Sequence, residues 1–71
     1  MIKIELEMID GVRHVLSASD EKTALEFLGV VNLDDVEFEG VYFPRERIHS
    51  VKFHTDKHTY FKIFNPKVVK A

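Results

Sequence analysis

The chain has 71 residues, of which 45% are hydrophobic and 31% are charged, a composition that suits one small globular domain and leaves no room for a deep substrate cleft. It has no cysteine, which excludes disulfides, thiolate zinc sites and cysteine nucleophiles and is in keeping with a reducing compartment. The formal net charge is −2, and no run of about 18 apolar residues is present that could span a membrane.

Residues 2–8 alternate apolar and charged side chains, which is typical of a strand with one buried face and unlike the continuous apolar segment of a secretory signal. The Asp-Gly pair at residues 10–11 then indicates a hairpin. A two-residue loop would mix apolar and charged side chains on one face. A three-residue loop at residues 9–11 keeps the apolar side chains together and sets Glu7 opposite Arg13. We therefore predict the three-residue loop, with its glycine in the left-handed conformation.

A helix is predicted to begin at residues 19–21, Ser-Asp-Glu, because Ser19 can cap the first turn and acidic residues suit the positive end of the helix dipole. Gly29 is expected to end the helix. A helix of about ten residues does not persist alone, so it must pack on the sheet. The predicted core stripe consists of Ala24, Leu25, Phe27 and Leu28.

Residues 36–43 predict a third strand whose apolar positions change phase at Gly40. A bulge there would turn the apolar side chains on both sides of it inward and would turn Tyr42 outward. A turn over residues 44–47 follows, with proline at a position where its restricted φ helps. The inward side chains of this strand would be Val36, Phe38, Val41 and Phe43.

Two further strands are predicted at residues 48–54 and 58–64, joined by a three-residue loop at residues 55–57. This loop length separates the two faces, whereas a two-residue loop would mix them. The inward side chains would be Val51, Phe53, Thr59, Phe61 and Ile63. The outward row would interleave cations and aromatic rings: Lys52, His54, His58, Tyr60, Lys62 and Phe64.

The resulting order, β-β-α-β-β-β, predicts an α+β fold with a curled, mainly antiparallel sheet. We expect a small roll or partly open barrel with one short helix closing one end. A β-grasp-like arrangement, which also begins with a hairpin and a helix, is the alternative. Residues 1–66 would form the single domain, and residues 67–71 would form a loose C-terminal tail.

The outward row of the last two strands is the predicted interaction face. Aromatic rings on a sheet can stack on unpaired bases and lysines can neutralise phosphates, so single-stranded nucleic-acid binding is one candidate function. Against it, residues 58–64 lack the glycine of the RNA-recognition signature, and the chain is acidic overall. With Tyr42 from the third strand, the predicted face comprises Tyr42, Lys52, His54, His58, Tyr60, Lys62 and Phe64.

The charge is divided unevenly between the two halves of the chain. Residues 1–39 hold ten acidic and three basic side chains, whereas residues 40–71 hold two acidic and seven basic ones. The halves either neutralise each other within one fold or attract a second copy. A small chain without disulfides and with free strand edges also favours assembly. We therefore predict a small module that binds another protein or forms a homodimer.

The residues offer little for catalysis or metal binding. His54 and His58 would face each other across a loop with Asp56 at its tip, but this set lacks a fourth ligand, so no metal site is predicted. His14 falls on the apolar face of the first hairpin, where a histidine at the edge of the core is expected. No serine lies in a nucleophile motif, and no glycine-rich loop could hold a phosphate. We predict no cofactor, no enzymatic activity and a cytoplasmic protein that does not enter a membrane.

Overall fold

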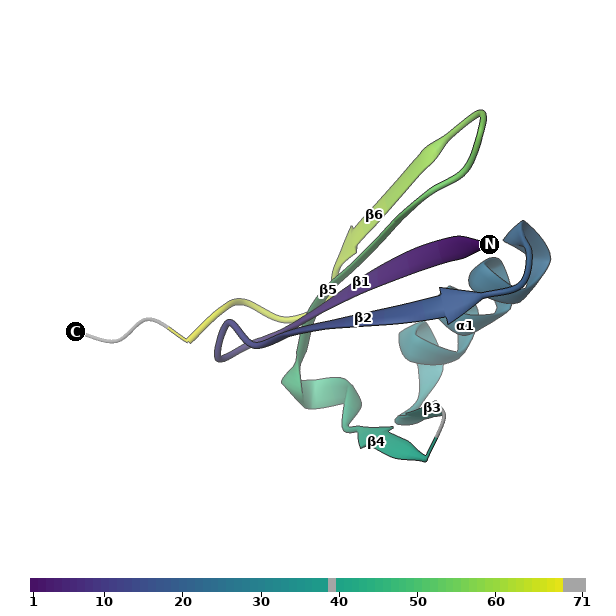
Figure 1. Cartoon of the computed structure of the whole chain (residues 1–71). Coiled ribbons are helices and arrows are strands. Elements are labelled where there is room, and N and C mark those ends of the chain that lie inside the picture. Colours follow the sequence, from purple (N-terminus) through teal and green to yellow (C-terminus); the bar gives the residue numbers. More distant parts are fainter. Residues whose placement is uncertain (39, 69–71) are drawn as a thin grey trace.

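The structure is a computed structural model that describes residues 1–38 and 40–68. Four strands form one antiparallel sheet in the order β2-β1-β5-β6, and β3 and β4 form a separate two-stranded sheet (Figure 1). The predicted α+β class with one helix is confirmed, and the sheet is open rather than closed into a barrel. The elements are β1 (Ile2–Met8), β2 (Arg13–Ala18), α1 (Glu21–Leu33), β3 (Val36–Phe38), β4 (Val41–Phe43), the 3₁₀ helix η1 (Arg45–Arg47), β5 (Ile48–His54) and β6 (Thr59–Ile63).

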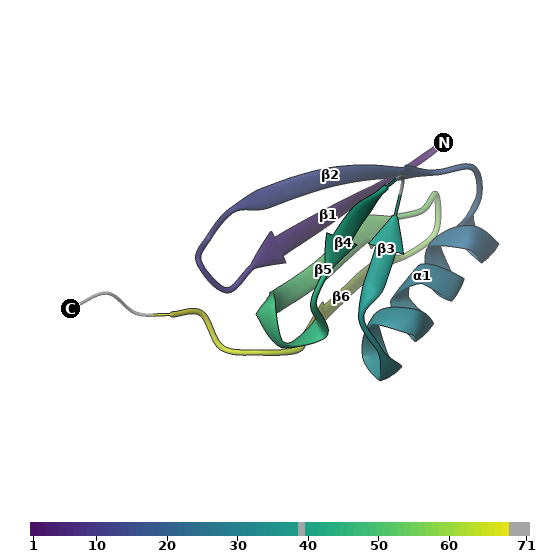
Figure 2. The same cartoon turned by 90° about the horizontal axis from the view of Figure 1, so that it is seen from below.

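The helix and the β3–β4 hairpin lie on the same face of the four-stranded sheet (Figure 2). Alternation in β1 turns Ile4 and Leu6 toward this face, where both are buried. The opposite, outer face of the sheet has no described element packed on it (Figures 1 and 2). The core side chains are Ile4, Leu6, Leu16, Ala18, Ala24, Phe27, Val31, Val36, Phe43, Ile48, Val51 and Phe53.

The β1–β2 hairpin has the predicted three-residue loop. The Gly11 N–H donates to the Met8 carbonyl at 2.9 Å, and the Met8 N–H donates to the Val12 carbonyl at 2.8 Å. Gly11 has a φ of 91°, a left-handed conformation that costs least at glycine. The register places Glu7 opposite Arg13, as expected.

The helix differs from the prediction at both ends. Its N-cap is Asp20 rather than Ser19, because the Asp20 carboxylate accepts a hydrogen bond from the Thr23 N–H at 2.8 Å. Gly29 does not end the helix, which continues to Leu33. The extra turn buries Val31 completely, a gain of about 1.5–3 kcal/mol that exceeds the cost of about 1 kcal/mol for glycine within a helix. Leu25, predicted in the core stripe, is 39% exposed.

The predicted third strand is a hairpin rather than one bulged strand. Gly40 has a φ of 81°, and the chain reverses there so that β3 pairs with β4. This pairing sets Val36 opposite Phe43, both buried, and leaves Val41 exposed. The side chain of Phe38 lies outside the described part of the structure.

The predicted register of β5 and β6 is wrong by one residue. The connecting loop has four residues, 55–58, so His54 pairs with Thr59 and not with His58. The Thr55 hydroxyl holds the loop by accepting a hydrogen bond from the His58 N–H at 3.0 Å. Because side chains alternate along a strand, the extra loop residue exchanges the two faces of β6. Tyr60 therefore points to the core side and Phe61 to the outer face.

The segment after β6 returns to the first hairpin. The Val68 N–H donates to the Ile9 carbonyl at 2.8 Å, and the Lys67 ammonium lies 2.9 Å from a Glu7 carboxylate oxygen. The first two residues of the predicted tail are thus held against the domain. Residues 69–71 of that tail lie outside the described residues.

Candidate interaction surface

The structure does not bring the seven predicted face residues together. Tyr42 lies on β4, in the other sheet, and His58 lies in the β5–β6 loop. Lys52 is on the outer face, whereas Lys62 pairs with Val51 on the face that carries the helix. His54 shares the outer face with Lys52, whereas Tyr60 and Phe64 pack against the core cluster.

The Tyr60 side chain is packed against the fold and does not project into solvent. Its ring stacks on Phe53 with centroids 4.8 Å apart, and its hydroxyl donates to the Glu21 carboxylate at 3.1 Å. This hydrogen bond raises the pKa of Tyr60 above its ordinary value. The ring is therefore not available to stack on a base.

The outer face instead presents residues that were predicted to be internal or were not singled out. Backbone pairing places Val15, Glu5, Lys52 and Phe61 side by side across β2, β1, β5 and β6. Val15 is 63% exposed and Phe61 is 58% exposed. We call these four residues the central row. Its order across the sheet is apolar, acidic, basic, apolar.

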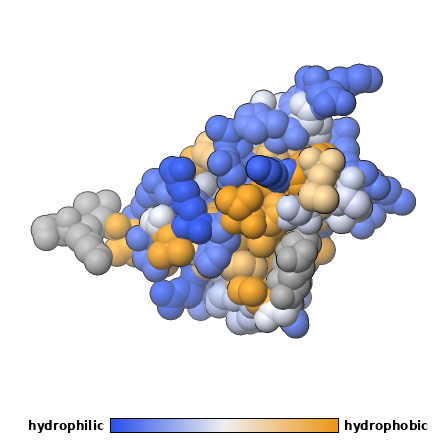
Figure 3. All heavy atoms as spheres, viewed as in Figure 1, coloured by the Kyte–Doolittle hydropathy of each residue, from blue (hydrophilic) through white to orange (hydrophobic). Residues whose placement is uncertain are grey.

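A second row runs beside the central row and consists of Arg13, Glu7, Ser50 and Ile63. Ile63 is 57% exposed. Between the two rows lies a shallow depression of about 60 Å³. The hydrogen bond from Lys67 lowers the pKa of Glu7, so this carboxylate stays charged. Figure 3, which views the molecule from the β2 edge, shows apolar residues near β2 and toward the β3–β4 hairpin, with hydrophilic residues to either side.

The charge asymmetry of the sequence does not carry over to this face, because the outward side chains of β1 and β2 include Lys3 and Arg13 beside Glu5 and Glu7. The sheet order puts β1 and β2 from the acidic half beside β5 and β6 from the basic half. The halves meet where Glu5 lies opposite Lys52. Among the described residues, neither of these two side chains forms an ion pair within 4.0 Å, so both charges remain available to a partner.

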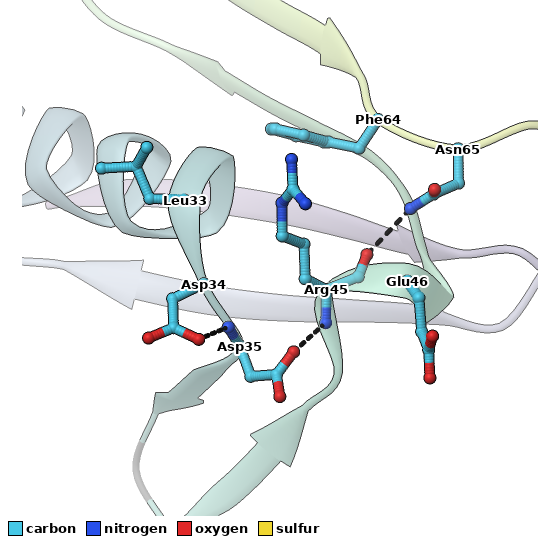
Figure 4. Close-up of a pocket in the computed structure, with 7 residues that line it drawn as sticks. All are labelled: Leu33, Asp34, Asp35, Arg45, Glu46, Phe64 and Asn65. Atoms are coloured by element: carbon cyan, nitrogen blue, oxygen red, sulfur yellow. Dashed lines mark hydrogen bonds between the residues drawn. The ribbon is translucent and has the colours of Figure 1, made fainter.

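A groove of about 410 Å³ lies on a different part of the surface. Figure 4 shows the Arg45 side chain extending between Leu33 and Phe64. The polar groups around it are mostly engaged with the fold: the Asp35 carboxylate accepts from the Arg45 N–H at 2.8 Å, and the Asn65 amide donates to the Arg45 carbonyl at 2.8 Å. These bonds tie η1 to the segment that follows α1 and to the segment that follows β6.

Asp35 and Tyr42 predict a pH dependence of stability. The Tyr42 hydroxyl, followed by the Arg45 N–H, holds the pKa of Asp35 below its ordinary value of 3.8. A lowered native pKa stabilises the fold above the ordinary value, and that stability is lost as pH falls through the native pKa. The same bond raises the pKa of Tyr42 above 10.0, so its contribution is lost as pH rises through that higher value.

Tyr42→Phe should therefore move the pKa of Asp35 back toward its ordinary value, only partly because the Arg45 N–H remains. A carboxyl NMR titration of both proteins measures this. Asp20, whose pKa is lowered by Thr23, is the internal control and should titrate identically in both. An unchanged Asp35 titration would show that the tyrosine bond does not form in solution.

The histidines occupy separate environments. The His54 ring lies 2.9 Å from the Thr59 hydroxyl, and His14 packs edge-on against Phe43 with centroids 5.1 Å apart, at the edge of the core as predicted. Within residues 1–38 and 40–68, no group of three histidine or carboxylate side chains has the geometry to hold a metal ion.

The sequence pattern does not place Phe61 and Ile63 on the outer face, because the predicted loop is one residue shorter than the observed loop. A signal for the longer loop was present: Thr55 begins the connection, and its hydroxyl accepts from the N–H groups of both Lys57 and His58. A threonine that caps a four-residue turn in this way is a recognised turn pattern.

The sequence matches no protein-family model, and neither the curated proteins nor the solved structures include a significant match. In the described part of the chain, no helix is both long and apolar enough to cross a membrane.

Proposed function

We propose that this protein is a non-enzymatic binding module that docks another protein on the outer face of its four-stranded sheet. The observation that carries the proposal is the exposure of three large apolar side chains, Val15, Phe61 and Ile63, on that face. An antiparallel sheet with one solvated face ordinarily presents polar side chains to water. Exposed apolar side chains rimmed by charge are typical of a protein contact.

The composition of the face also favours a protein over a nucleic acid. Phe61 and Arg13 are residue types enriched in protein interfaces. Glu5 and Glu7 lie among the basic side chains, where their carboxylates would repel phosphates. The proposal places this binding in the cytoplasm, in keeping with a chain that has no cysteine.

Site-specific photocrosslinking tests this proposal. A photoreactive phenylalanine analogue replaces Phe61, and a matched variant carries it at Leu25, which is exposed on the helix. In cell extract, light should produce a protein adduct from position 61 and none from position 25. Excess unmodified protein should reduce the yield of this adduct by competing for the partner, whereas an excess of a Val15→Lys, Phe61→Lys double variant should not.

Two outcomes would contradict the proposal. Equal labelling from both positions would show that the outer face has no selectivity, and no labelling from position 61 would show that nothing docks there. An adduct that disappears after nuclease treatment and weakens steeply with salt would favour the nucleic-acid alternative.

A further inference from the structure

We infer that the partner of the outer face is a second copy of this chain, which docks face to face on the central row; this inference rests on the proposed function. The argument starts from the order of that row, Val15, Glu5, Lys52, Phe61. When this row is laid over a second copy in the reverse order, apolar residues meet apolar residues at both ends. In the middle, each acidic residue meets a basic one.

A two-fold axis parallel to the strands, passing between β1 and β5, makes use of this order. It places β1 of one copy over β5 of the other and β2 over β6. Glu5 then faces Lys52 of the second copy, and Val15 faces Phe61 of the second copy. Each contact occurs twice, as an isologous dimer requires. Opposite charges that face each other give such an interface specificity and orientation.

Sheet twist does not remove these contacts. Stacked sheets cross at about 30°, which a two-fold axis achieves by tilting about 15° from the strands. The outer strands lie about 7 Å from the axis, so the tilt moves Phe61 by about 3.5 Å along its strand, roughly one residue. The Glu5–Lys52 pair lies closer to the axis and moves less.

The second row is compatible with the same dimer. The axis brings Arg13 over Ile63 of the second copy and Glu7 over Ser50, so no like charges face each other in this row. The apolar stem of an arginine can cover an isoleucine while its guanidinium stays in water. Ser50 is buried at the base of the depression between the rows, and Glu7 is paired with Lys67 of its own copy, so this pair adds no charge repulsion.

The size of the face predicts a weak dimer. Four strands and seven residues give a face about 19 Å wide and 23 Å long, or about 400 Å² from each copy. The total of about 800 Å² lies below the 1,200–2,000 Å² or so of stable complexes. We therefore expect a dissociation constant in the micromolar range or weaker, with dimers visible from high micromolar to millimolar concentration.

Charge exchange between Glu5 and Lys52 tests this arrangement with purified protein. Glu5→Lys would set lysine against lysine twice in the dimer, and Lys52→Glu would set glutamate against glutamate twice. Sedimentation equilibrium should show each single variant self-associating on the order of tenfold more weakly than the wild type. Glu26→Lys, the same charge change on an exposed helix position, should leave the association unchanged.

The decisive samples combine the exchanges. An equimolar mixture of Glu5→Lys and Lys52→Glu should dimerise, because all facing pairs become lysine against glutamate. The double variant, with both exchanges in one chain, should recover self-association. Recovery in these two samples separates facing contacts from a loss of folding, because a misfolded variant would not be rescued by its counterpart.

Three results would overturn the inference. The wild type could remain monomeric to millimolar concentration, the single variants could associate like the wild type, or the mixture could fail to pair. If the wild type self-associates and neither charge exchange changes the strength of that association, the copies would instead pair through a strand edge. In each case the photocrosslink from position 61 still decides separately whether another protein docks on the outer face.

Discussion

Phe53→Asp should leave the protein unfolded, whereas Lys52→Asp should leave it folded. Phe53 is 1% exposed, lies opposite Ile4 on β1 and stacks on Tyr60 of β6. Removing a buried aromatic ring costs about 3–5 kcal/mol, and an unpaired carboxylate in its place costs more. A domain of this length is stable by about 4–10 kcal/mol, so the substitution consumes most or all of that stability.

The control lies one residue earlier on the same strand. Lys52 points to the outer face beside Glu5, so an aspartate there adds only a like-charge pair, at a cost of about 0.2–1 kcal/mol. Circular dichroism and amide NMR dispersion should show a folded Lys52→Asp protein and an unfolded Phe53→Asp protein. Equal stability of the two variants would mean that β5 does not have the alternation described for it.

Tyr60→Ala should destabilise the fold by about 2–3 kcal/mol, whereas Phe61→Ala should change stability by less than about 0.5 kcal/mol. The Tyr60 ring stacks on Phe53, an arrangement that contributes about 0.5–1.5 kcal/mol beyond the area buried. Its hydroxyl bond to Glu21 contributes about another 1 kcal/mol. Phe61 is 58% exposed on the outer face, so its removal leaves no cavity.

Urea denaturation of the two variants at low protein concentration measures this difference without a contribution from dimer formation. Tyr60→Phe is a useful intermediate, because it keeps the ring and removes only the hydroxyl bond. If Phe61→Ala lowered the free energy of unfolding more than Tyr60→Ala, the β5–β6 loop would have three residues and Tyr60 would lie on the outer face.

Several elements were predictable because neighbouring residues alone determine them. The alternation in residues 2–8 and a glycine after Asp10 leave one loop length that keeps the apolar side chains of β1 and β2 on the same face. The bounds of β5, Ile48–His54, also agree with the prediction. In the first hairpin the alternation meets a glycine whose left-handed conformation suits one loop length, and β5 begins directly after the proline turn at residues 44–47.

The remaining differences have a common cause, which is packing between residues far apart in the chain. Both faces of β6 carry aromatic rings, so its own sequence does not choose between them. Tyr60 is turned inward by Phe53 and by Glu21, which lies 39 residues earlier. In the same way, the helix continues beyond Gly29 because Val31 is buried in the core.

The candidate surface, too, is determined partly by short-range sequence pattern and partly by packing between distant residues. The acidic and basic halves can be read directly from the sequence, as can the alternation that turns Glu5 and Lys52 away from the core. Their position side by side, with Val15 and Phe61 at the two ends of the row, depends on β1 pairing with β5 and on the four-residue loop before β6. Sequence determines which charges a strand carries, whereas strand order and register, set by burial of the opposite face, decide which of them become neighbours.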